Sequence, residues 1–85
     1  MEQMFTIYSK PNCTFCDQAK ALMTQLDLPY HEIVLDIGQE HEVNTKYMPV
    51  QEFKALNPTA RTVPQIFLDD KLIGGFAALK QHVAA

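Results

Sequence analysis

The chain has 85 residues, of which 47% are hydrophobic, and a formal net charge of −3 at pH 7. A chain this short buries only about 60–65% of the surface that its unfolded form exposes, so we expect one domain over residues 1–85 with a thin core. Lysines and arginines are scattered, which argues against a nucleic-acid partner. No apolar run reaches the roughly 20 residues of a membrane span, and the start lacks a signal-peptide pattern, so we expect a cytoplasmic protein.

The first elements along the chain read as a strand, a helix and a strand. Residues 4–8 (MFTIY) are typical of a short buried strand. From Cys13 onward, apolar residues recur at spacings of three and four, which predicts a helix that Leu28-Pro29 ends. Residues 31–35 (HEIVL) predict a second strand. Because the three elements fit within about 30 residues, they form a βαβ unit with parallel strands.

The remaining elements follow a stretch, residues 36–49, in which no element is evident. Residues 50–56 predict a short helix, and residues 64–68 and 71–74 predict a hairpin with a two-residue turn. A last helix follows Gly74-Gly75 and runs to about residue 83. The order β-α-β-α-β-β-α predicts an α/β fold of the minimal thioredoxin-like type, with a mixed four-stranded sheet and helices on both faces.

The two cysteines, Cys13 and Cys16, lie where the first strand passes into the first helix. Unpaired N–H groups and the positive end of the helix dipole stabilise a thiolate there, so we expect Cys13 to be more acidic than a free thiol of pKa about 8.5. Lys10 adds positive charge nearby, while Asp17 works against it with a smaller, solvated effect. We expect Cys13 to be the exposed nucleophile and Cys16 the less exposed thiol.

The spacing of the pair favours dithiol chemistry over metal binding. Residues three apart share one helix face with α-carbons about 5 Å apart, inside the disulfide range of about 4.4–6.8 Å. Cys13 can therefore attack a disulfide, and Cys16 can resolve the resulting mixed disulfide. A closed zinc site needs four ligands, and the isolated His31, His41 and His82 lack zinc-ligand spacing, so we expect no bound metal.

Three segments in this order resemble a glutaredoxin: residues 8–16 (YSKPNCTFC), 62–67 (TVPQIF) and 73–76 (IGGF). The resemblance covers most of the chain outside residues 38–57. It implies a cis peptide before Pro64, which would face Cys13, and a Val63 backbone that pairs with glutathione as an added strand would. The implied glutathione site consists of Lys10, Thr14, Phe15, Thr62, Val63, Pro64, Gly75, Phe76 and Ala77.

The resemblance also implies what each part of that site does. The γ-glutamyl carboxylate would sit on the backbone N–H groups of Phe76 and Ala77, because a helix N-terminus attracts anions. Gly74 and Gly75 would let the ligand come close. Lys10 would face the glycyl carboxylate, with Arg61 as the alternative.

The sequence departs from the family pattern in two places. Many glutaredoxins carry an Asp shortly after the double glycine, where this chain has Ala77 and Ala78, and a Pro-Tyr pair where it has Thr14-Phe15. We expect a monomeric, glutathione-linked thiol–disulfide oxidoreductase for protein disulfides or glutathione mixed disulfides, with ribonucleotide reductase a client by family analogy. Two alternatives stay open: a redoxin dependent on thioredoxin reductase, and an iron–sulfur cluster carrier formed by a glutathione-bridged dimer.

Overall fold

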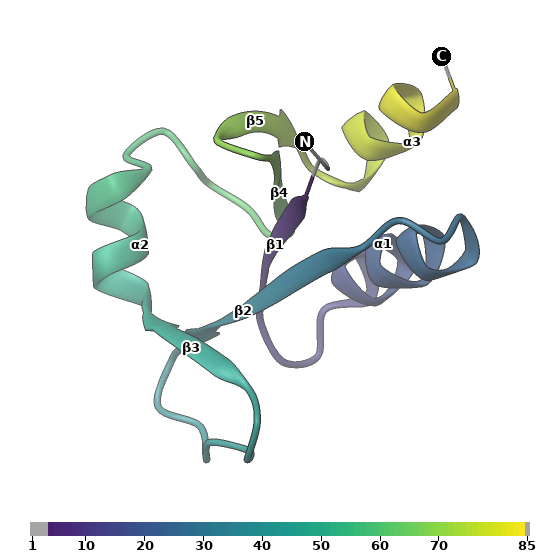
Figure 1. The fold of residues 1–85 in the computed structure, drawn as a ribbon. Coiled ribbons are helices and arrows are strands. Elements are labelled where there is room, and N and C mark those ends of the chain that lie inside the picture. The colour runs from purple at the N-terminus through teal and green to yellow at the C-terminus, as the bar shows by residue number, and fades with distance from the viewer. Residues whose placement is uncertain (1–3, 85) are drawn as a thin grey trace.

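The computed structural model describes residues 4–84 and arranges them as a five-stranded sheet with three helices (Figure 1). Except for β3, the elements lie close to the expected positions. Within residues 4–84, no helix has both the length and the apolar character needed to cross a bilayer. The elements in chain order are β1 (Phe5–Ser9), α1 (Thr14–Gln25), β2 (Tyr30–Asp36), β3 (Lys46–Pro49), α2 (Val50–Leu56), β4 (Gln65–Leu68), β5 (Lys71–Gly74) and α3 (Phe76–Ala84).

The sheet is mixed, and its strands follow the order β3-β2-β1-β4-β5. β1 and β2 are parallel, which confirms the predicted βαβ unit. β4 runs antiparallel to β1 and also pairs with β5 in the predicted hairpin. The thioredoxin-like α/β fold is therefore confirmed, with one more strand than we predicted.

The fifth strand, β3, is where the prediction of four strands was wrong. β3 pairs in parallel with β2, so that Leu35 lies opposite Met48. It is an edge strand of four residues, its two end residues are exposed, and it closes on Pro49. Edge strands tolerate a terminal proline and a charged residue such as Lys46. This segment therefore carries neither a buried run nor an alternation that would reveal a strand.

The connection between β2 and β3, residues 37–45, is short for a parallel crossover and contains no helix. Side chains hold it in place instead: the His41 ring stacks on Tyr47 at 3.8 Å, and its Nε2 lies 3.0 Å from Asp36 Oδ2. The Gly38 backbone N–H donates to the other Asp36 oxygen at 2.9 Å. The Gly38 and His41 hydrogen bonds, in that order, hold the pKa of Asp36 below its ordinary value.

Helices cover both faces of the sheet, as predicted, with α1 and α3 on one face and α2 on the other (Figure 1). The face toward α1 and α3 holds the main core cluster, which consists of Phe5, Ile7, Ala19, Met23, Ile66 and Leu79. On the opposite face Tyr8 packs against Phe53 and Phe67, with ring centroids 4.9 and 5.7 Å away.

Candidate active site

Cys13 is the N-cap residue of α1. Its sulfur accepts a hydrogen bond from the Cys16 backbone N–H at 3.2 Å, the role that a serine or aspartate oxygen plays at most helix starts. Asn12 precedes it with a positive φ of 58°, which lets the chain turn sharply from β1 into the helix. The turn thus delivers the Cys13 sulfur to the positive end of the helix dipole, where a thiolate is stabilised.

The structure closes a disulfide between Cys13 and Cys16, whose α-carbons are 5.2 Å apart. Cys16 is 1% exposed and Cys13 is 8% exposed, so the predicted order of accessibility is confirmed. The prediction that Cys13 is exposed was wrong, because the segment before β4 covers it. The Cys13 sulfur lies 3.9 Å from the Val63 carbonyl oxygen.

A groove of about 380 Å³ adjoins the cysteine segment through Phe15 and Val63, although neither cysteine lines it. The peptide bond between Val63 and Pro64 is cis, which confirms that part of the prediction. The groove brings together the start of α1, the segment before β4 and the start of α3. Its lining consists of Phe15, Thr62, Val63, Pro64, Gly75, Phe76 and Ala77.

Two residues expected in the glutathione site do not line this groove. Lys10 lines a separate hollow, which it shares with Asp17 and Glu32. Thr14 is the exposed first residue of α1. Arg61, the alternative partner for the glycyl carboxylate, is exposed in the segment before β4.

The groove is apolar and none of its lining residues is charged. Phe15 is 60% exposed, and its ring packs against the Phe76 ring with centroids 6.2 Å apart and planes tilted by 31°. Lys80 places its ammonium 5.4 Å from the centre of the Phe76 ring. The first turn of α3 contains no acidic residue, so the groove offers anions the free N–H groups at that helix start.

The two glycines before α3 have different roles. Gly74 has φ +128°, and a Cβ there would lie 2.9 Å from the Ala78 Cβ. A Cβ on Gly75 would meet the Pro64 carbonyl oxygen at an ordinary 3.6 Å. Gly74 is therefore needed for the path of the backbone into α3, whereas Gly75 lies in the groove.

We predict that Gly74→Ala lowers the free energy of unfolding by about 2 kcal/mol, because a side chain at that φ is strained and also collides with Ala78. The matched variant Gly75→Ala should stay within about 0.5 kcal/mol of the unchanged protein. Urea unfolding of both variants measures the difference. Equal losses from the two substitutions would contradict the distinct roles of the glycines.

A polar cluster that sequence reasoning missed joins β1, α1 and β2, the elements on either side of the cysteine segment. Glu32 Oε2 accepts hydrogen bonds from Lys20 Nζ at 2.8 Å and from the buried Ser9 hydroxyl at 2.7 Å. Lys20 also lies 3.7 Å from Asp17. The one available signal was the position of Lys20, one helical turn after Cys16; its pairing with Glu32 depends on the tertiary fold.

A cysteine pair at the first turn of a helix, next to a cis proline in a mixed sheet, defines a dithiol redox protein of the thioredoxin-like class. Among residues 4–84, no three His, Cys, Asp or Glu side chains gather in an arrangement that could hold a metal ion. The glutaredoxin family model matches residues 5–73. The chain therefore belongs to the glutaredoxin family.

Known proteins agree with this assignment. The chain is 38% identical over 69 residues to glutaredoxin 1 of Rickettsia bellii, a match that covers 81% of this chain and 65% of the relative. It is 31% identical over 84 residues to the hybrid peroxiredoxin hyPrx5 of Haemophilus influenzae, covering 99% of this chain and 31% of that protein. These matches therefore span less than two thirds of either relative's length.

Solved structures show the same fold. Glutaredoxin 1 from Francisella tularensis, complexed with cacodylate, superposes with a TM-score of 0.72 at 26% identity, covering 98% of this chain and 94% of the other. A wheat glutaredoxin gives a TM-score of 0.69 at 32% identity, with 95% and 73% covered.

Proposed function

We propose that this protein is a glutathione-linked thiol–disulfide oxidoreductase that reduces protein disulfides or mixed disulfides with glutathione. The observation that carries the proposal is the Cys13–Cys16 disulfide at the start of α1, beside the groove at Pro64. Membership of the glutaredoxin family supports the same chemistry. The two-thiol spacing provides for both an attacking and a resolving sulfur.

The reaction begins from the reduced form. The Cys13 thiolate attacks one sulfur of the client disulfide, a new S–S bond joins Cys13 to the client, and the second client sulfur leaves as a thiolate that takes a proton. The Cys16 thiolate then attacks the Cys13 sulfur and releases the first client sulfur. Two electrons have passed to the client, and the protein is left with the Cys13–Cys16 disulfide.

Glutathione would restore the thiols in two further exchanges. One glutathione thiolate opens the protein disulfide and forms a mixed disulfide with Cys13, releasing Cys16 as a thiol. A second glutathione attacks the glutathione sulfur of that mixed disulfide and releases Cys13. The two glutathione molecules leave as glutathione disulfide, so they have been oxidised by two electrons and the protein disulfide has been reduced. Cys13 is again a thiolate at the helix start, ready for the next client.

The groove supports glutathione binding through backbone groups and an aromatic wall. We propose that Val63 pairs with the cysteinyl backbone, that Phe76 and Ala77 donate N–H groups to the γ-glutamyl carboxylate, and that Phe15 covers the ligand. Because Ala77 and Ala78 offer no carboxylate, one charge-assisted contact of roughly 1.5–3 kcal/mol is missing. We therefore expect weak affinity for glutathione together with intact dithiol chemistry.

Three further properties are proposed from family resemblance alone. The protein would act as a monomer, in the cytoplasm, and ribonucleotide reductase would be one client to assay. The cytoplasmic proposal fits a catalytic dithiol, because that compartment keeps thiols reduced.

A coupled assay tests the electron source. Purified protein receives a glutathione mixed disulfide as substrate, with NADPH and either glutathione plus glutathione reductase or thioredoxin reductase alone. We expect turnover with glutathione to be at least about tenfold faster, because the groove offers backbone and aromatic contacts to a small peptide thiol. Turnover with thioredoxin reductase alone would overturn the proposal in favour of the redoxin alternative. A coloured dimer after anaerobic reconstitution with iron and sulfide, without turnover, would favour the cluster carrier.

A further inference from the structure

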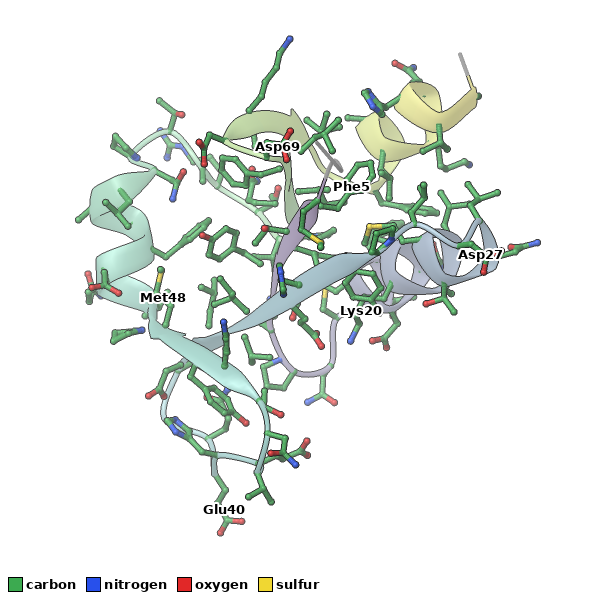
Figure 2. The ribbon with its side chains drawn as sticks, in the orientation of Figure 1. Phe5, Lys20, Asp27, Glu40, Met48 and Asp69 are labelled. Carbon is green, nitrogen blue, oxygen red and sulfur yellow. A yellow bond between two sulfur atoms is a disulfide. The ribbon has the colours of Figure 1, made fainter. Side chains whose placement is uncertain are left out.

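The polar cluster of Ser9, Lys20 and Glu32 includes residues on both sides of the cysteine segment along the chain. Ser9 is the last residue of β1, directly before the loop that leads to Cys13, and it is only 2% exposed. Lys20 extends from α1 (Figure 2), and its ammonium donates to Glu32 on β2 at 2.8 Å. One carboxylate oxygen of Glu32 thus joins the strand before the cysteines to the helix after them.

The charges of this cluster lie within electrostatic reach of the Cys13 sulfur at low ionic strength. Lys20 follows Cys13 by seven residues, or about two helical turns, so their α-carbons are about 10 Å apart. Lys20 and Glu32 also line one hollow with residues 10–12, the loop that carries Cys13. At about 10 Å, a unit charge in a water-like dielectric shifts the pKa of a thiol by about 0.3 pH units.

We propose that Lys20 and Glu32 form a balanced charge pair that sets the acidity of the Cys13 thiol and, through it, the redox equilibrium of the Cys13–Cys16 pair. Lys20 stabilises the thiolate, and Glu32 limits that effect by neutralising Lys20. Neither side chain takes part in the exchange reactions, so both are positioning residues. The inference about redox rests on the proposed function, whereas the inference about thiol acidity does not.

Lys20 is a permanent cation in this pair. Burial disfavours its charge, but the hydrogen bond and charge of Glu32, together with Asp17 and Tyr30, outweigh burial, and the pKa of Lys20 lies above its ordinary value. The ammonium therefore stays protonated throughout the range in which a thiol titrates. The other titratable groups that face the pair, or that line its hollow, are Lys10, Asp17, Tyr30, Glu40, Glu42 and Tyr47.

Two single substitutions test the pair by the sign of their effects. Lys20→Met leaves Glu32 and Asp17 unneutralised, so the pKa of Cys13 should rise by about 0.3 pH units at low ionic strength. Glu32→Gln keeps an oxygen for the Ser9 hydroxyl and frees the charge of Lys20, so that pKa should fall by a similar amount. Thiol alkylation rates of the reduced protein against pH measure both shifts.

The redox equilibrium with glutathione should follow the thiol. A more stable thiolate favours the reduced form, so Glu32→Gln should shift the equilibrium constant about twofold, or ~9 mV, toward a stronger oxidant, and Lys20→Met about twofold the other way. The double variant should return close to the unchanged protein. A structural role would instead move both single variants in one direction, because each loses the same ion pair.

The control pair is Lys54→Met and Glu52→Gln on α2, across the sheet from α1. These variants remove the same charges at exposed positions and should leave the thiol pKa unchanged.

Shifts of equal sign in Lys20→Met and Glu32→Gln, or no shift in either, would overturn the proposal. If Lys20→Met does not fold, Glu32→Gln alone still decides, together with Lys20→Arg, which should match the unchanged protein. If the protein does not exchange disulfides with glutathione but the thiol pKa shifts are still observed, the proposed function is contradicted. The inference that Lys20 and Glu32 set the acidity of Cys13 then still stands.

Discussion

Replacing Cys13 with serine is expected to lower the rate of disulfide reduction at least about a thousandfold. The serine hydroxyl keeps the shape of the N-cap and accepts the Cys16 N–H hydrogen bond, so the fold should persist. It cannot supply a thiolate at neutral pH, and the helix dipole that favours the Cys13 thiolate is too weak to ionise a hydroxyl. The measurement is reduction of a glutathione mixed disulfide, with circular dichroism to confirm folding.

Cys16→Ser is the matched variant, since it removes the other sulfur of the same disulfide. Cys13 can still attack a glutathione mixed disulfide and be released by a second glutathione, so that activity should remain within about tenfold. Reduction of a protein disulfide should fall much further, because the mixed disulfide with the client has no internal thiol to resolve it. Retained activity in Cys13→Ser would refute the mechanism, and so would equal losses from both variants on the small substrate.

The βαβ unit and the terminal hairpin could be predicted because their signals are local. Apolar spacing defines α1, and the two-residue turn at Asp69-Asp70 defines the hairpin of β4 and β5. β3 could not be predicted in the same way. Its pairing with β2 depends on a crossover ordered by the contacts of His41 with Asp36 and Tyr47, and such contacts leave no periodic pattern in the sequence.

The candidate site shows the same division. The groove was predictable because its residues lie in short motifs, and the turn at Asn12 brings the cysteine motif next to Val63 in the segment before β4. Lys10 lines a hollow apart from this groove, because its distance along the chain from Cys13 does not determine which side of the loop it occupies. The Lys20–Glu32 pair was invisible because it joins a helix to a strand, and only the tertiary fold sets that register.

The site depends on the core beneath it, and Ile66 is the residue where the two meet. Ile66 is 0% exposed, lies opposite Ile7 on β1, and follows the groove residue Pro64 closely along the chain. It belongs to the cluster that also includes Met23 of α1 and Leu79 of α3. Loss of its side chain would therefore leave a cavity among the elements that hold both walls of the groove.

We expect Ile66→Ala to lower the free energy of unfolding by about 2–5 kcal/mol, through lost burial and the cavity that remains. A domain of this size has roughly 5–15 kcal/mol in all, so the variant should melt at least about 10 °C lower. Leu72→Ala on the neighbouring β5 removes a branched aliphatic side chain that is 51% exposed, and it should cost less than about 1 kcal/mol. Thermal and urea unfolding of the oxidised proteins measure both. A loss in Ile66→Ala no larger than in Leu72→Ala would show that the cluster between the sheet and helices α1 and α3 is not the core on which the groove rests.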